Sequence, residues 1–208
     1  VRALTRPGGH GSSVAIRMVS ATTCALTLVV VAAAITRLGL YQDAYGLTML
    51  RLACTTFAWI LGAAFVLLGI RMLQPRGRDW LPTAYLGLAV AALVWWNGSN
   101  PEVTVAETNL TRATATGKLD VDYLVTMSDD AMPALIDGID ALPTAQAEEL
   151  RSRLCTPTPD RWNAPGGSHV TVDRDGIVRV RSGWAAFNTS RRAAVEAVQG
   201  CADGEANH

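Results

Sequence analysis

The sequence is poor in the residues on which most catalytic and metal sites depend. It has three histidines, His10, His169 and His208, and none has partners at the spacing that a zinc site or a catalytic histidine needs. It also lacks a CxxC pair, a nucleophile elbow and a glycine-rich phosphate loop. The sequence therefore predicts no catalytic residue, no metal and no cofactor, and we expect a protein that is not an enzyme.

Acidic residues come nearest to forming a site. Asp173-Arg174-Asp175-Gly176 begins like a calcium loop but lacks the later oxygen ligands and the glutamate at the twelfth position, which favours a polar turn. The pairs Asp120 with Asp122 and Asp129 with Asp130 are too close in sequence to face each other on a helix. Helix capping and solubility explain these pairs better than acid–base chemistry does.

Lysine is almost absent, because Lys118 is the single lysine among eighteen basic residues. This scarcity, together with abundant alanine, is typical of a GC-rich bacterial genome. Residues 1–99 hold eight arginines and two aspartates, a net charge of +6, whereas residues 100–208 hold ten basic and sixteen acidic residues, a net charge of −6. The basic residues flank apolar segments and form no patch with aromatic platforms, which excludes nucleic acid as a partner.

Charge is missing from three long apolar runs. The clearest is residues 52–70, nineteen residues that would form a helix close to the ~30 Å hydrocarbon thickness of a bilayer. Residues 18–35 form a second run, for which a signal peptide is the alternative interpretation. Residues 81–96 form a third, shorter run, flanked by tryptophans that are typical of membrane interfaces. The sequence therefore predicts three transmembrane helices and the lipid bilayer as a partner.

The arginines predict the orientation of these helices. Two segments on one face hold six arginines: Arg2, Arg6 and Arg17 before the first run, and Arg71, Arg76 and Arg78 after the second. The opposite loop holds Arg37 and Arg51, with Asp43 offsetting one of them. By the positive-inside rule we expect a cytoplasmic segment at residues 1–17, a membrane domain at 18–98 and an extracytoplasmic soluble domain at 99–208. The expected location is the bacterial inner membrane.

The four cysteines divide between the two halves. Cys24 and Cys54 lie in the apolar runs, where a thiol is usually a small apolar side chain. Cys155 and Cys201 lie in the soluble half, where an external location permits a disulfide worth roughly 2–4 kcal/mol. Two unrelated buried thiols are the alternative.

The soluble half reads as a small helical domain. Capping residues and amphipathic spacing predict helices over residues 102–115, 119–127, 131–139, 145–154 and 190–198. Alternating residues at 169–172 and 177–180 predict one β-hairpin. The expected fold class is mainly α, with three transmembrane helices followed by a helical extracytoplasmic domain that contains this hairpin.

The first loop is the part of the membrane half with the most chemistry. Arg37, Asp43 and Arg51 form a candidate interfacial charge cluster, since a charge near the bilayer is costly unless it is paired or reaches the headgroups. Asp43 has either arginine as a candidate partner. The alternative is a connector anchored by Tyr41 and Tyr45.

Four stretches resemble the signatures of one family: YQDAYGLTMLRL at 41–52, Asn100-Pro101-Glu102 with Asn109, residues 119–135, and Trp184 with residues 187–191. Together they resemble a bacterial polytopic membrane family of unknown function, DUF4173, a sibling of DUF4153. The similarity covers most of the chain from residue 18 onward. Relatives are longer and have additional N-terminal helices, so we expect this chain to be the C-terminal portion of a longer protein. The resemblance implies no known reaction, ligand or site residue.

Three hypotheses of function follow. The first is a non-enzymatic membrane protein that acts through protein or envelope contacts of its external domain. The second is a transporter or channel component, favoured by small residues four apart, such as Ala58 and Gly62, and disfavoured because the second and third runs contain no ionisable residue. The third is a membrane sensor that works with a separate output partner.

Overall fold

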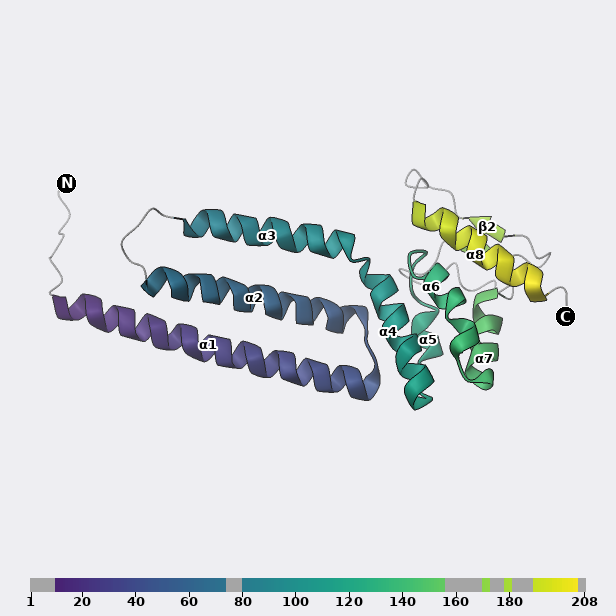
Figure 1. Cartoon of the computed structure of the whole chain (residues 1–208), viewed down its shortest axis with the longest axis horizontal. Helices are drawn as coiled ribbons and strands as arrows, with labels where there is room; N and C mark the ends of the chain where they lie inside the picture. The colour runs from purple at the N-terminus through teal and green to yellow at the C-terminus, as the bar shows by residue number, and fades with distance from the viewer. Residues whose placement is uncertain (1–9, 74–79, 156–169, 173–177, 181–188, 206–208) are drawn as a thin grey trace. The chain divides into compact units, whose positions relative to one another are not determined.

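A computed structural model describes residues 10–73, 80–155, 170–172, 178–180 and 189–205 (Figure 1). This part of the chain is mainly helical. Its elements are α1 His10–Tyr45, α2 Met49–Leu73, α3 Leu81–Gly98, α4 Pro101–Thr116, α5 Val121–Leu124, α6 Met132–Asp137, the 3-10 helix η1 Ile139–Ala141, α7 Thr144–Cys155, β1 Val170–Val172, β2 Val178–Val180 and α8 Thr189–Glu205.

The chain forms two compact units. Unit 1 consists of residues 1–42 and 50–96, and unit 2 consists of residues 43–49 and 97–208. The segment Asp43–Met49, here called the connector, joins α1 to α2 and yet belongs to unit 2. Unit 2 is therefore assembled from two stretches that are distant in sequence.

Within unit 1, α1 and α2 pack antiparallel. At one end the Arg17 guanidinium donates to the Met72 carbonyl at 3.2 Å, and at the other Gln42 Nε2 donates to Thr55 Oγ1 at 3.1 Å. Between them Gly62 faces Val31, whose Cγ1 would lie 3.4 Å from a Cβ added at Gly62. The small residue lets the two backbones approach closely.

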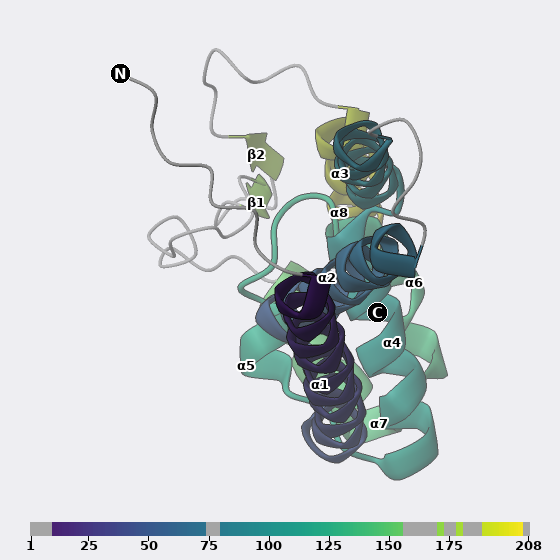
Figure 2. The ribbon, with the colours of Figure 1, turned by 90° about the vertical axis from the view of Figure 1, so that its left-hand side faces the viewer.

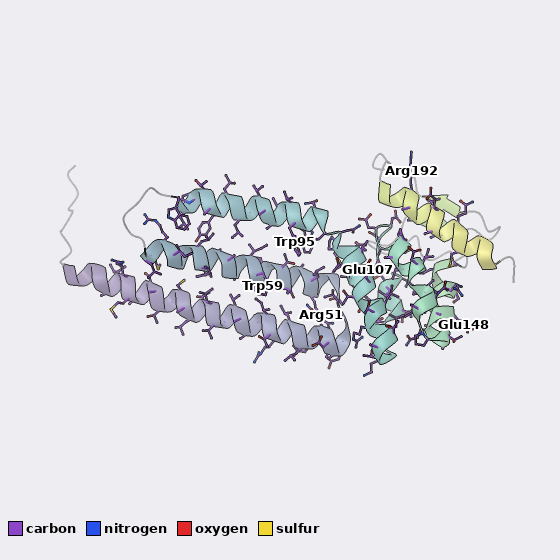
Figure 3. The ribbon with its side chains drawn as sticks, viewed as in Figure 1. Arg51, Trp59, Trp95, Glu107, Glu148 and Arg192 are labelled. Carbon is purple, nitrogen blue, oxygen red and sulfur yellow. A yellow bond between two sulfur atoms is a disulfide. The ribbon has the colours of Figure 1, made fainter. Side chains whose placement is uncertain are left out.

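The third helix of unit 1 runs beside α2, and both views show α2 between α1 and α3 (Figures 1 and 2). The Tyr85 hydroxyl donates to the Ala64 carbonyl at 3.2 Å and fixes α3 against α2. An apolar groove of about 460 Å³ lies between them, with Trp59 of α2 and Trp95 of α3 in its lining (Figure 3).

The prediction of three transmembrane helices is wrong. Two described helices are long and apolar enough to cross a membrane, over Ala15–Tyr45 and Met49–Leu73. The predicted third span forms α3, which has only 18 residues and carries Pro82 and Thr83 at one end and Trp95, Trp96 and Asn97 at the other. These residues lower the mean hydropathy of α3, and they leave it a continuous apolar stretch that is much shorter than the helix.

Unit 2 has its own core, built from α4, α6, α7 and α8. The amphipathic stripe of α4 buries Val105, Leu110 and Ala113, and beneath it lie Leu135, Leu150, Leu154 and Val198. Asn100 precedes α4 in the left-handed region at φ 43°, which Asn adopts more readily than most residues, and Pro101 supplies the first turn. The bounds of α4, α6 and α7 agree with the predicted ranges within two residues, whereas α5 is shorter than the predicted 119–127 and α8 continues beyond the predicted 190–198.

The predicted β-hairpin is not seen in the described residues. The structure has two three-residue strands, β1 and β2, which pair antiparallel with Val170 opposite Val180 and Val172 opposite Val178 (Figure 2). The turn expected at Asp173–Gly176 and the predicted strand residues His169 and Ile177 lie outside the described part of the chain. The fold class is thus corrected to two candidate spans, with a short two-strand ladder in unit 2.

Gly138 allows α6 to pack on α4. A Cβ at this position would lie 2.5 Å from Leu110 Cδ1 and 3.1 Å from the Ala134 carbonyl oxygen. We expect Gly138→Ala to lower the free energy of unfolding by about 1–3 kcal/mol through overpacking. Thermal unfolding of the detergent-purified full chain measures this, with Gly200→Ala on α8 as the control because nothing lies within 4 Å of its Cβ. Equal melting temperatures for the two variants would contradict the prediction.

Candidate functional site

The connector makes the most elaborate polar contacts in the described structure. Gly46 ends α1 in the left-handed region at φ 82°, a conformation that glycine adopts without strain. A Cβ at Gly46 would lie 2.5 Å from the side-chain oxygen of Asn109 on α4. Glycine is therefore required here both by the backbone conformation and by the close approach of α4.

Asn109 binds the connector through its whole carboxamide. Its Oδ1 accepts from the Leu47 amide N–H at 3.0 Å, and its Nδ2 donates to the Leu47 carbonyl at 2.7 Å and to the Val105 carbonyl at 2.9 Å. Asn109 is 9% exposed and Leu47 is 6% exposed. The side chain thus pairs with the backbone of Leu47 as a neighbouring strand would, in a place that water does not reach.

Arg112 lies one turn further along α4 and holds the end of α1. Its Nε donates to the Asp43 carbonyl at 3.1 Å, and its Nη2 donates to the Ala44 carbonyl at 2.7 Å. These carbonyls belong to the last turn of α1, where no intrahelical donor is left for them. A cation at a helix C-terminus is also favoured by the helix dipole.

Two further contacts complete the docking of the connector and its support. The Tyr123 hydroxyl of α5 accepts from the Met49 amide N–H at 2.8 Å, which satisfies the first amide of α2. Behind this, the Glu102 carboxylate accepts from the Ser128 amide at 2.8 Å and from the Ser128 hydroxyl. The side chains of Asn109, Arg112 and Tyr123 thus bind the backbone of the connector at four residues, Asp43, Ala44, Leu47 and Met49.

The three residues of the predicted charge cluster differ in their exposure and in their contacts. Asp43 has an exposed side chain and takes part through its backbone carbonyl, while Arg51 is partly buried and has an interaction partner. Arg37 is exposed on α1. Two ion pairs, Arg151–Asp140 and Arg153–Asp122, lie on the surface of unit 2.

The residues that do hold the connector, Asn109, Arg112 and Tyr123, were not predicted as site residues. Two of them lie in the stretches that carry the family resemblance, Asn109 in the NP…N segment and Tyr123 in LDVDYL. Their counterparts Gly46 and Leu47 lie in YQDAYGLTMLRL. Three of the four stretches that carry the resemblance therefore meet in space, and Trp184 of the fourth lies outside the described residues.

The two cysteines named from the sequence are joined by a disulfide. Cys155 at the end of α7 and Cys201 on α8 have Cα atoms 5.7 Å apart and are separated by 46 residues. Cys24 and Cys54 are free thiols in α1 and α2. Of the histidines, His10 is the first residue of α1, and His169 and His208 lie outside the described residues.

The acidic residues weighed as candidate acids have structural roles or none. Asp120 caps α5 by accepting from the Tyr123 amide at 3.0 Å, and Asp129 is buried with a partner inside unit 2. A hollow of about 1060 Å³ where α6, η1, α7 and α8 meet has four acids in its lining: Asp137, Asp140, Glu148 and Glu196. No group of three or more metal-ligating side chains converges among the described residues.

Most of these motifs lie in the region that matches a known family. Residues 1–138 match the domain of unknown function DUF4153. The resemblance to its sibling DUF4173 is not confirmed, although both are families of unknown function. No curated protein and no solved structure matches the chain. The matched region includes the connector and its partners on α4 and α5 and stops before the disulfide.

Proposed function

The chain belongs to the DUF4153 family, and on that premise we propose that it is a multi-pass membrane protein of the bacterial envelope that acts through contacts of unit 2 outside the cytoplasm. Protein partners or other envelope components are the proposed targets of those contacts. The observation that carries the proposal is the pair of exposed apolar helices, α1 and α2.

Exposure of apolar side chains supports the membrane location. All the large apolar side chains that are exposed in the described chain lie between Ile16 and Trp95, including Val30, Phe57 and Trp59. Over residues 97–155 and 192–201 no large apolar side chain is exposed. An apolar face of this extent is unstable in water, and a bilayer covers it without a further partner.

Three features support an extracytoplasmic unit 2. The hydrogen bonds of Asn109 and Arg112 keep the connector on the same side of the membrane as α4. The disulfide between Cys155 and Cys201 favours an oxidising compartment, because cytosolic thiols are kept reduced. The six arginines in and before the first turns of α1, and in and after the last turn of α2, favour the cytoplasm for these ends of the two helices.

A binding role in place of a catalytic one rests on how the buried polar groups are used. The carboxamide of Asn109 uses both of its N–H donors and one acceptor position for hydrogen bonds to the connector and to α4, which favours a structural role for this side chain. The apolar groove between α2 and α3 has no ionisable residue in its lining, which disfavours a transport pathway. Turnover of a defined substrate by the purified chain would contradict this part of the proposal.

The orientation is tested by labelling single cysteines in intact cells. Starting from a Cys24→Ala/Cys54→Ala variant that keeps the disulfide, Asp160→Cys reports on unit 2 and Arg76→Cys on the segment after α2. We expect a membrane-impermeant maleimide to label residue 160 before lysis and residue 76 only after lysis. Labelling in the reverse order would overturn the proposed sidedness, and release of the chain from membranes by alkaline carbonate would overturn membrane integration itself.

A further inference from the structure

We propose that Arg37 and the exposed face of α1 around it bind the phosphate of an anionic phospholipid headgroup. This inference deepens the proposed function, because it requires that α1 crosses the bilayer. The chemistry is that of a guanidinium pairing with a phosphate, for which the planar fork of arginine is well suited.

Arg37 lies on a face of α1 that no described part of the chain covers. Its neighbours one turn away on the same face are Ala33 on one side and Leu40 and Tyr41 on the other, and all three are exposed. Leu40 is 65% exposed and Tyr41 is 56% exposed. The guanidinium therefore extends from a mainly apolar surface that the proposed function places against lipid.

Arg37 differs from the other described arginines of unit 1 in having no internal partner. Arg17 donates to the Met72 carbonyl at 3.2 Å, and Arg51 and Arg71 each have an interaction partner. Within the described residues Arg37 has neither a hydrogen bond nor an ion pair. Asp43 follows six residues later on the same helix, which places it about 120° away from Arg37 around the helix axis. Among the described residues, therefore, no anion compensates the charge of Arg37, which leaves it available to an anionic ligand.

The spacing along α1 brings Arg37 to the depth at which phosphates begin. Arg17 and Arg37 are twenty residues apart, and at 1.5 Å per residue this is about 30 Å, the thickness of the hydrocarbon layer. Residues 18–36 between them carry no charge. Tyr41, one turn beyond Arg37, is then at the level where aromatic rings prefer to lie. A headgroup phosphate reaches this face from the surrounding lipid, whereas an acidic protein partner would have to be brought to it.

Native mass spectrometry of the full chain, released from nanodiscs of equal phosphatidylglycerol and phosphatidylcholine, tests this site. We expect the wild-type chain to retain phosphatidylglycerol in preference to phosphatidylcholine, and Arg37→Gln to lower the ratio of the two retained lipids about fivefold, the preference that one arginine near a charged surface supplies. Arg37→Lys should keep most of the wild-type ratio because it keeps the charge. Arg192→Gln on α8 is the control, since it removes the same charge from unit 2 (Figure 3).

An Arg37→Gln chain with the wild-type lipid preference overturns the lipid site. So does a variant whose lipid preference is unchanged while its oligomeric state shifts, because that result assigns Arg37 to a protein contact. Failure of the proposed function would give a different result, namely release of the wild-type chain from membranes by alkaline carbonate. Replacing Arg37 removes no described internal contact, so the variant is expected to fold.

Discussion

Replacement of Asn109 by leucine is expected to lower the free energy of unfolding of unit 2 by about 2–5 kcal/mol. The change leaves the buried amide and carbonyl of Leu47 without partners, and each unsatisfied buried group costs about 1–3 kcal/mol. The apolar side chain does not offset this loss, because it would occupy the space between α4 and a connector backbone that needs a polar partner.

Thermal unfolding of the detergent-purified full chain measures the loss, and amide hydrogen exchange at Leu47 assigns it to the connector. Thr108→Ala, a neighbouring exposed position on α4, is the control and should change stability little. Asn109→Asp keeps an acceptor for the Leu47 amide and loses both donated bonds, so it should also destabilise strongly. An Asn109→Leu chain within about 1 kcal/mol of the wild type would show that the pairing with Leu47 is dispensable.

Loss of the disulfide is expected to have an effect of similar size. The disulfide closes a loop of 46 residues. In the chain-entropy treatment this raises the free energy of the unfolded chain, and so stabilises the folded one, by about 4 kcal/mol. The bond joins α7 to α8, and α8 contributes Ala194 and Val198 to the core of unit 2. A Cys155→Ala/Cys201→Ala chain should therefore unfold at a markedly lower temperature than the wild type.

The free thiol of Cys54 supplies the matched control, because it is exposed and unbridged. Cys54→Ala should melt like the wild type, and reductant should lower the melting temperature of both chains to that of the double variant. A double variant that melts with the oxidised wild type would show that α8 is held by its apolar contacts alone. Protection of α8 from hydrogen exchange distinguishes its local release from unfolding of the whole unit.

The sequence predicts the helices of unit 2 well because their signals are local. Asp120 caps α5, Pro101 opens α4 and Gly117 ends it in the left-handed region, so the bounds of α4 differ by one residue at each end from the predicted 102–115. Such signals act within a turn of the helix and need no knowledge of the fold.

The candidate site could not be predicted in the same way. Asn109 occupies the core-facing stripe of α4 between Val105 and Ala113, where the sequence shows a polar residue on a buried face and nothing of its partner. That partner, Leu47, lies 62 residues earlier, and the pairing is set by the tertiary packing of the connector. The charge cluster of Arg37, Asp43 and Arg51 stays a prediction, because closeness in sequence does not determine which charged side chains meet around a helix.

The number of candidate membrane spans was predicted wrongly because the bounds of α3 could not be read from the sequence. Residues 81–96 contain the apolar core expected of a span, yet the helix they form includes Pro82 and Thr83 at its start and two indoles and Asn97 at its end. Length and mean hydropathy, which decide whether a helix can cross a bilayer, are properties of the whole element. Those bounds are known only once the helix is seen.

The discontinuous make-up of unit 2 has a consequence for the order in which the chain matures during synthesis. The connector is synthesised before α4. The Leu47 amide and carbonyl therefore stay hydrogen-bonded to water until about sixty more residues, up to Asn109, have been synthesised. A truncated chain beginning near residue 97 would lack the connector, and Asn109 would have no Leu47 backbone to bind. Any separately expressed version of this domain should therefore be supplied with the Asp43–Met49 segment, fused or in trans, before its binding is measured.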